Sequence, residues 1–135
     1  MRFFLFTDGA SRGNPGPAGA GVLLKDEAGR VILEGSQFLG RMTNNEAEYR
    51  ALLFGLTKAA TAVPGKTLVV LMDSELVISQ LRGVYRIKAA HLRELLMEVK
   101  VKESAFEKLI YKLIPREKNA QADALANEAL DNNAG

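Results

Sequence analysis

The sequence predicts an α/β fold in which a mixed five-stranded sheet is flanked by helices. Three apolar-rich segments of strand length come first, and helical and strand-like segments alternate from residue 44 onward. Strands that alternate with helices run parallel to one another, because each helix crosses back over the sheet. Two of the early segments flank a short polar turn and form a hairpin, which adds antiparallel pairing to the same sheet.

The three early strands are predicted from their apolar pattern and from the residues that bound them. Residues 2–8 alternate in polarity and end in polar groups, which is typical of a strand. Residues 18–26 and 30–39 are apolar-rich and are joined across a polar turn at 26–29, so we expect them to pair with each other.

Helical spacing and turn residues place the later elements. Residues 44–62 repeat apolar side chains with helical period, and Pro64-Gly65 closes this helix. Residues 67–72 form a continuous apolar run that is short enough for a buried strand. The same reasoning predicts helices at 74–82 and 89–103, a strand at about 106–114 and a final helix at about 120–131.

Length and composition are those of a globular protein. The 135 residues are 47% hydrophobic and 25% charged, and no repeat or long linker divides them. We therefore expect a single domain over residues 1–135, with the last few residues disordered. The absence of cysteine excludes disulfides and permits a reducing cytoplasm. The apolar run that begins at Phe3 stops at Thr7, too early for a signal peptide or membrane span, so we expect a cytoplasmic protein without membrane association.

Basic residues are concentrated in one part of the chain. Residues 82–118 carry ten basic and five acidic side chains, although the net charge of the whole chain is only +2. Such a local excess is typical of a surface that faces phosphates. The alternative is an ordinary solvated helix face, because acidic residues are interleaved with the bases. Charge alone leaves both interpretations open.

Two aspartates follow predicted strands. Asp8 ends the first strand, and Asp73 comes directly after the apolar run 67–72. Ligands of open α/β sheets gather beyond the carboxyl ends of parallel strands, so these carboxylates are expected to meet in one crevice. Each also has a structural alternative: Asp8 precedes Gly9 and can begin a turn, and Asp73 or Ser74 can cap the next helix.

Glu48 lies on the apolar stripe of the helix predicted over 44–62. The stripe comprises Leu52, Gly55, Leu56 and Ala59. An ionised carboxylate that faces the sheet is costly unless a cation or a donor compensates it, so Glu48 is a candidate functional residue. Glu46 is interpreted as structural instead, because with Thr43 it forms the Thr-x-x-Glu pattern of a capping box.

Asp123 flanks the apolar stripe of the last predicted helix. By itself it is a first-turn acid that favours the helix dipole. Carboxylates that converge at sheet ends repel one another unless divalent cations neutralise them, and oxygen ligands suit Mg²⁺ or Mn²⁺. Zinc is a poor fit, because the chain has one histidine and no cysteine.

Four motifs together resemble the signature of type 1 ribonuclease H. They are Thr7-Asp8-Gly9-Ala10-Ser11-Arg12-Gly13-Asn14-Pro15-Gly16-Pro17, Thr43-Asn44-Asn45-Glu46-Ala47-Glu48, Met72-Asp73-Ser74 and Asn119-Ala120-Gln121-Ala122-Asp123. They occur in the family's order and, with the Ala124-Leu125-Ala126 that follows the last motif, extend from residue 7 to residue 126. The chain is therefore identified as a member of this family, which implies the ribonuclease H-like fold.

The resemblance implies an endonuclease that hydrolyses the RNA strand of RNA–DNA hybrids with two Mg²⁺ ions, for which Mn²⁺ substitutes. Asp8 would bridge both ions, and Asp123 would hold the ion that activates water. Glu48 and Asp73 would hold the other ion. Substrate contacts to the backbone or minor groove are implied for Asn14, Thr43, Asn44 and Asn45, with turn and cap roles as the alternative. The implied partner is the hybrid, and no obligate protein partner is evident.

The sequence departs from the family in the loop after the last strand. Many members carry a histidine there, whereas residues 114–119 contain none. Arg116 is the nearest candidate to replace it. A guanidinium stays protonated and cannot act as a base, but it can bind a phosphate. The single histidine, His91, falls in a predicted helix and is not assigned to catalysis.

A second departure is the missing tryptophan-bearing basic handle of some bacterial relatives. Residues 80–86 lead almost directly to the next helix, and Tyr85 is their only aromatic residue, as in the handle-less bacterial and archaeal branch. Two other functions are considered. One is a same-fold nuclease with a different substrate, such as a resolvase, transposase or exonuclease. The other is a non-catalytic hybrid-binding module, whose mark would be a lost carboxylate, yet all four are present.

Overall fold

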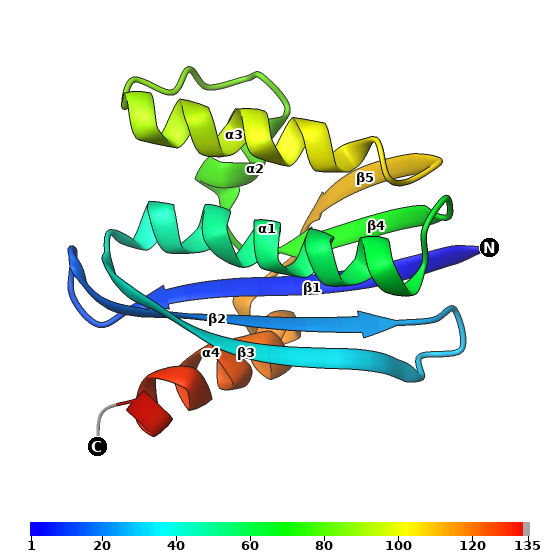
Figure 1. Cartoon of the computed structure of the whole chain (residues 1–135), viewed down its shortest axis with the longest axis horizontal. Helices are drawn as coiled ribbons and strands as arrows, with labels where there is room; N and C mark the ends of the chain where they lie inside the picture. The colour runs from blue at the N-terminus through cyan, green and yellow to red at the C-terminus, as the bar shows by residue number, and fades with distance from the viewer. Residues whose placement is uncertain (134–135) are drawn as a thin grey trace.

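The computed structural model describes residues 1–133 and confirms the mixed five-stranded sheet flanked by helices (Figure 1). Its elements in chain order are β1 (Arg2–Ser11), β2 (Gly16–Lys25), β3 (Val31–Met42), α1 (Asn44–Ala62), β4 (Thr67–Met72), α2 (Glu75–Leu81), α3 (Ala90–Glu103), β5 (Lys108–Leu113), the 3-10 turn η1 (Arg116–Asn119) and α4 (Ala120–Asn133).

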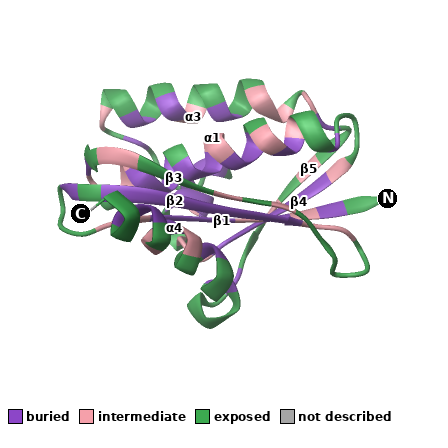
Figure 2. Ribbon diagram, turned by 60° about the horizontal axis from the view of Figure 1, so that its bottom comes forward, coloured by how far each residue is buried: buried purple, intermediate pink, exposed green. Residues whose placement is uncertain are grey.

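The strands lie in the order β3-β2-β1-β4-β5, with β1 at the centre. β1 pairs antiparallel with β2 and parallel with β4, and β4 pairs parallel with β5. The early hairpin is β2 with β3, as predicted. Helices α1 and α3 lie on one side of the sheet, and α4 lies on the other (Figures 1 and 2).

The main core fills the space between the sheet and α1, α2 and α3. On α1, the predicted stripe is buried, because Leu52, Leu56 and Ala59 have no exposed surface. On the other face, α4 presents small residues to β2 and approaches it closely. A methyl group on Gly21 would overlap the carbonyl oxygen of Ala122, so this contact requires glycine. Figure 2 shows the buried residues of the sheet between the helical layers.

The predicted position of Asp8 at the end of the first strand is wrong. The pairing of β1 with β4 stops at Phe6, which lies opposite Leu71. Its antiparallel pairing with β2 continues to Ser11, so the strand passes through Asp8. A hairpin partner can extend a strand beyond its parallel neighbour, and this extension is invisible in the apolar pattern of β1 alone. Asp8 nevertheless lies beyond the carboxyl end of β4.

The other boundaries agree with the prediction to within a few residues, and those of α1 and β4 are the same. The turn η1 lies in a segment predicted as a loop. Helix α4 runs to Asn133, so the part of the predicted C-terminal disorder that falls on residues up to Asn133 is wrong. Ala134 and Gly135 lie outside the described residues. Within residues 1–133, no helix has the length and apolarity that crossing a bilayer requires.

Candidate active site

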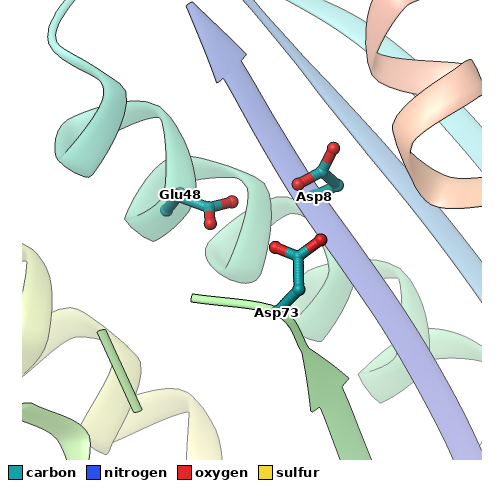
Figure 3. A group of neighbouring side chains, drawn as sticks. All are labelled: Asp8, Glu48 and Asp73. Carbon is teal, nitrogen blue, oxygen red and sulfur yellow. The ribbon is translucent and has the colours of Figure 1, made fainter. Parts of the chain in front are cut away.

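Three carboxylates from separate elements meet beyond the carboxyl end of β4. Asp8 comes from β1, Glu48 from α1 and Asp73 from the residue after β4 (Figure 3). Each offers one oxygen atom, and the three oxygens lie within 4.8 Å of one another. Two of the residues are buried, since Asp8 is 6% exposed and Glu48 is 4% exposed. The structure therefore brings together three of the four predicted carboxylates as one compact group.

Glu48 is held by a close approach of α1 to β1. A side chain on Gly9 would overlap the backbone of Ala47, so glycine lets the helix lie directly on the strand. At this contact the backbone N–H of Gly9 donates to Glu48 Oε1 at 2.6 Å. The helix stripe thus carries the carboxylate into the interior, and the strand backbone fixes its direction. Sequence reasoning expected such a donor or cation but did not identify Gly9.

The backbone around Asp73 and Thr43 matches the predicted caps. Ser74 Oγ accepts a hydrogen bond from the N–H of Val77 and caps α2, so Asp73 is not the cap. Thr43 Oγ1 accepts from the N–H of Glu46 and caps α1. The Glu46 side chain does not complete the capping box; it pairs with Arg50 at 3.0 Å. Glu46 is therefore a surface ion-pairing residue, in line with a structural role.

The carboxylate group carries more negative charge than its surroundings stabilise. Burial, followed by the charge of Glu48 and contacts with Asp123 and Asp73, raises the pKa of Asp8 from 3.8 to about 9. Burial raises the pKa of Glu48 from 4.5 to about 8; the Gly9 N–H and the charge of Arg116 oppose this rise, and Asp73 adds to it. Both shifts mean that the group favours bound protons or a bound cation.

Asp123 lies beside this group and outside it. It is an exposed residue in the first turn of α4, and its carboxyl is within hydrogen-bonding reach of Asp8. It lines the same cavity of about 310 Å³ as the three clustered carboxylates. The four carboxylates of the cavity offer oxygen ligands, and this chemistry fits a hard divalent cation such as Mg²⁺ or Mn²⁺.

Arg116 also lines this cavity. It comes from η1, and its positive charge lowers the pKa of Glu48, although Arg116 is itself exposed. The turn is anchored by Asn119, whose side-chain N–H₂ donates to the carbonyl of Thr7 at 3.0 Å. Asn119 is 1% exposed and ties η1 to the strand next to Asp8. Sequence reasoning gave Asn119 no role, although its place in the last motif could have drawn attention to it.

The predicted substrate-contact residues line a second cavity, of about 460 Å³. Its lining includes Asn14, Thr43, Asn44 and Asn45, together with His91 from α3. Asn14 Oδ1 accepts from the backbone N–H of Asn44 at 3.1 Å and so links the β1–β2 connection to the start of α1. The turn and cap roles considered for Asn14 and Thr43 are therefore present. The His91 side chain is 58% exposed and lies 3.5 Å from Glu46.

Sequence comparisons show which proteins the chain resembles. A family model described as reverse transcriptase-like matches residues 6–129. The chain is 42% identical over 132 residues to a bifunctional protein of Mycobacterium tuberculosis. This match covers 97% of this chain and 36% of that protein. It is 41% identical over 130 residues to the ribonuclease HI of Halobacterium salinarum, covering 96% of this chain and 65% of that protein. The chain thus spans about a third of the mycobacterial relative's length.

Solved structures agree with these matches. The crystal structure of the H. salinarum RNase H1 superposes with a TM-score of 0.94 at 40% identity, covering 98% of this chain and 99% of that chain. LC11-RNase H1, solved in complex with an RNA/DNA hybrid, gives the same TM-score and identity over the same coverage.

Proposed function

The chain belongs to the type 1 ribonuclease H family, and on that basis we propose that it hydrolyses the RNA strand of RNA–DNA hybrids as a metal-dependent endonuclease. The observation that carries the proposal is the group formed by Asp8, Glu48 and Asp73, with Asp123 in the same cavity. These residues occupy the four carboxylate positions of the family's motifs. A non-catalytic module would have no need to keep so costly a cluster of buried charge.

We infer that Asp8, Glu48, Asp73 and Asp123 hold two Mg²⁺ ions, and that Mn²⁺ substitutes for Mg²⁺. Asp8 would hold both ions, because it belongs to the close group with Glu48 and Asp73 and lines the same cavity as Asp123. When bound, a pair of divalent ions activates the attacking water and stabilises the leaving oxygen of an in-line displacement. The Gly9 N–H, which donates to Glu48 Oε1, would orient this carboxylate for an ion.

Arg116 would contribute attraction rather than proton transfer. A guanidinium only donates hydrogen bonds, so Arg116 can bind and orient a phosphate at the cavity but cannot serve as a base. Its place in the cavity lining supports this role, and so does the lowering effect of its charge on the pKa of Glu48. We therefore assign Arg116 to substrate binding.

Hybrid recognition is assigned to the cavity lined by Asn14, Thr43, Asn44 and Asn45. Neutral amides and a hydroxyl can bind sugar and phosphate oxygens, and the 2′-hydroxyl is the group that distinguishes RNA from DNA. The basic segment 82–118 supports this assignment, because nine of its ten bases are exposed and its tenth, Lys102, is half-buried. We also propose that the protein acts in the cytoplasm and needs no obligate protein partner. A chain without cysteine is compatible with that reducing compartment.

A gel assay tests the proposed function. End-labelled RNA–DNA hybrid, RNA duplex and DNA duplex of one sequence are incubated with Mg²⁺, Mn²⁺, Ca²⁺ or excess chelator. We expect cleavage of the RNA strand of the hybrid with Mg²⁺ and Mn²⁺, and poor cleavage with Ca²⁺, because Ca²⁺ relaxes the octahedral geometry. Asp8→Asn, purified identically, controls for contaminating nucleases. Equal cleavage of the DNA duplex, or full activity in chelator, would contradict the proposal.

A further inference from the structure

The four carboxylates differ in how firmly they are held. Glu48 is buried and receives a backbone N–H at 2.6 Å. Asp123 is exposed and stands outside the close group of three, so packing does not restrict its side chain to one direction. A flexible ligand loses conformational entropy when it coordinates an ion, and contacts that restrict it beforehand reduce this cost.

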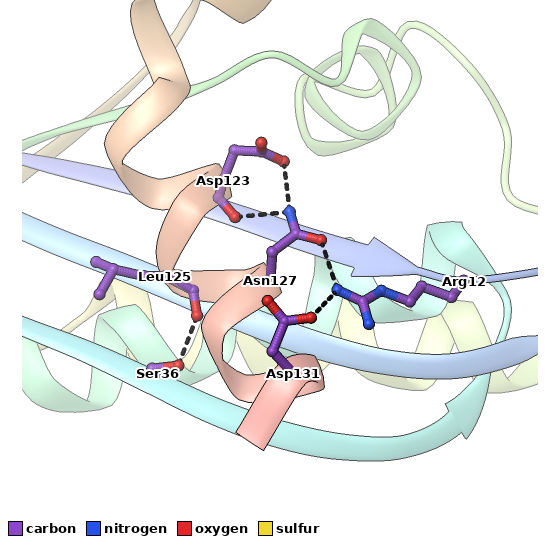
Figure 4. Close-up of polar contacts among 6 residues, drawn as sticks. All are labelled: Arg12, Ser36, Asp123, Leu125, Asn127 and Asp131. Atoms are coloured by element: carbon purple, nitrogen blue, oxygen red, sulfur yellow. Dashed lines mark hydrogen bonds and ion pairs between the residues drawn. The ribbon is translucent and has the colours of Figure 1, made fainter. Parts of the chain in front are cut away.

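Asn127, one helical turn further along α4, donates hydrogen bonds to Asp123 (Figure 4). Its N–H₂ group donates to Asp123 Oδ1 at 3.3 Å and to the Asp123 carbonyl at 3.0 Å. Residues four apart share one face of a helix, so Asn127 also lines the cavity of the carboxylates. The amide thus joins the carboxylate to its own backbone.

Arg12 determines which end of the Asn127 amide faces Asp123. Its guanidinium lies 3.3 Å from Asn127 Oδ1 and 2.6 Å from Asp131 Oδ1 (Figure 4). A guanidinium can only donate, so it selects the amide oxygen and leaves the N–H₂ group for Asp123. Arg12 comes from the β1–β2 connection and lines the same cavity. Asp131, Arg12 and Asn127 therefore form a chain of contacts that ends at Asp123.

The backbone of α4 is fixed by other contacts. Ser36 of β3 donates to the carbonyl of Leu125 at 2.5 Å (Figure 4), and Gly21 allows the helix to lie directly on β2. Loss of the Asn127 amide should consequently leave the helix in place and release only the Asp123 side chain. We propose that Asn127 is a positioning residue that directs Asp123 toward its metal ion, with Arg12 orienting the Asn127 amide. This inference rests on the proposed function, which makes Asp123 a metal ligand.

The test measures Mn²⁺ binding to the full chain by titration calorimetry, in the absence of nucleic acid. Asn127→Ala should bind Mn²⁺ about tenfold more weakly than wild type, the lower end of the range for contacts to metal ligands. Asn127→Gln, which keeps the amide on a longer stem, should recover part of the loss. Arg12→Gln should cause a smaller loss in the same direction. Asn132→Ala is the matched control, because Asn132 lies on α4 but lines a different cavity.

A double-mutant cycle separates positioning from a general effect. If Asn127 acts through Asp123, Asn127→Ala should cause no further loss of Mn²⁺ affinity in an Asp123→Asn background. Three outcomes would each overturn the inference. They are a loss of the same size in that background, unchanged Mn²⁺ affinity in Asn127→Ala, and an equal loss of affinity in Asn132→Ala. If wild type binds Mn²⁺ but cuts no hybrid, the proposed function fails, and the binding comparison still decides the role of Asn127.

Discussion

The cavity has two sides that are built differently. On the buried side, Asp8 and Glu48 come from a central strand and the helix packed against it, and both are almost inaccessible to solvent. On the exposed side, Asp123 and Arg116 come from α4 and η1, and both side chains are at the surface. Core packing surrounds the first pair, and a backbone N–H also holds Glu48, whereas hydrogen bonds from the Asn127 side chain hold Asp123. The raised pKa values therefore belong to the buried side, and the exposed side has the less restricted side chains.

The largest expected difference is in turnover. Asp8→Asn should reduce hybrid cleavage to the background of the assay, because it removes the proposed bridging charge with almost no change of volume. Asp123→Asn should leave a residual rate on the order of 100-fold below wild type, about 2.7 kcal/mol in activation free energy. An amide oxygen at an exposed position can be supplemented by water. Steady-state rates at saturating Mg²⁺ measure both, and equal inactivity of the two variants would remove the distinction between the sides.

Glycine substitutions should disturb each side separately. Gly9→Ala pushes α1 and Glu48 away from β1, and Gly21→Ala pushes α4 and Asp123 away from β2, since each added methyl would overlap backbone. We expect each to lower the free energy of unfolding by about 1–3 kcal/mol or more, as overpacking does. Urea unfolding measures this. Gly35→Ala is the milder control, because its methyl would meet only side-chain atoms; an equal loss there would contradict the reasoning.

The sequence predicts the residues on the buried side of the cavity better than those on the exposed side. The stripe of α1 located Glu48, and the apolar run of β4 located Asp73, because hydrophobic periodicity reports directly which residues face a core. Asp8 was placed at a strand end by the same pattern, and the extension of β1 to Ser11 depends on its pairing with β2. Long-range pairing leaves no signal in the periodicity of one strand.

The exposed side left weaker signals in the sequence. Asp123 taken alone was indistinguishable from a first-turn acid, and only the family's motif order assigned it to the site. The contacts of Arg12 and Asn127 join residues more than a hundred positions apart, which no local pattern reports. The close approach of α1 at Gly9 and of α4 at Gly21 likewise depends on where the helices lie, which no local pattern reports.

The pH dependence of stability should belong to the buried side. In the metal-free folded chain the pKa of Asp8 is raised to about 9 and that of Glu48 to about 8. At pH values between the ordinary carboxyl pKa range and these raised pKa values, the folded chain therefore binds more protons than the unfolded chain. The free energy of unfolding consequently falls as the pH rises through this range. Thermal unfolding in chelator should show a melting temperature that falls by several degrees from about pH 5 to about pH 9.

Measurements with added Mg²⁺ and with variants identify which carboxylates cause the fall in melting temperature. Saturating Mg²⁺ should largely abolish it, because a bound cation stabilises the ionised carboxylates. Asp8→Asn should reduce the fall and raise the metal-free melting temperature at high pH, since it removes a repulsive buried charge. Asp123→Asn should retain most of the fall, because the burial of Asp8 and Glu48 is unchanged. A flat profile in the wild-type chain would show that the buried carboxylates stay ionised without cost.

The smallest expected effect concerns Arg116, on the exposed side. If its guanidinium binds a phosphate of the hybrid, Arg116→Ala should cost about 1–3 kcal/mol in kcat/KM, the usual range for a charge-assisted contact. Arg116→Lys should restore only part of the loss, because lysine keeps the charge but not the two-pronged geometry of the guanidinium.

Lys118→Ala is the matched control: Lys118 is an exposed base in the same turn, and only Arg116 of the two lines the cavity. Steady-state kinetics at one low salt concentration compare the three variants. An equal loss in Lys118→Ala would mean that general positive charge, screened by salt, is what matters. Unchanged kinetics in Arg116→Ala would assign Arg116 to the solvated surface, where isolated charges contribute little, and would leave the buried carboxylates as the main determinants of activity.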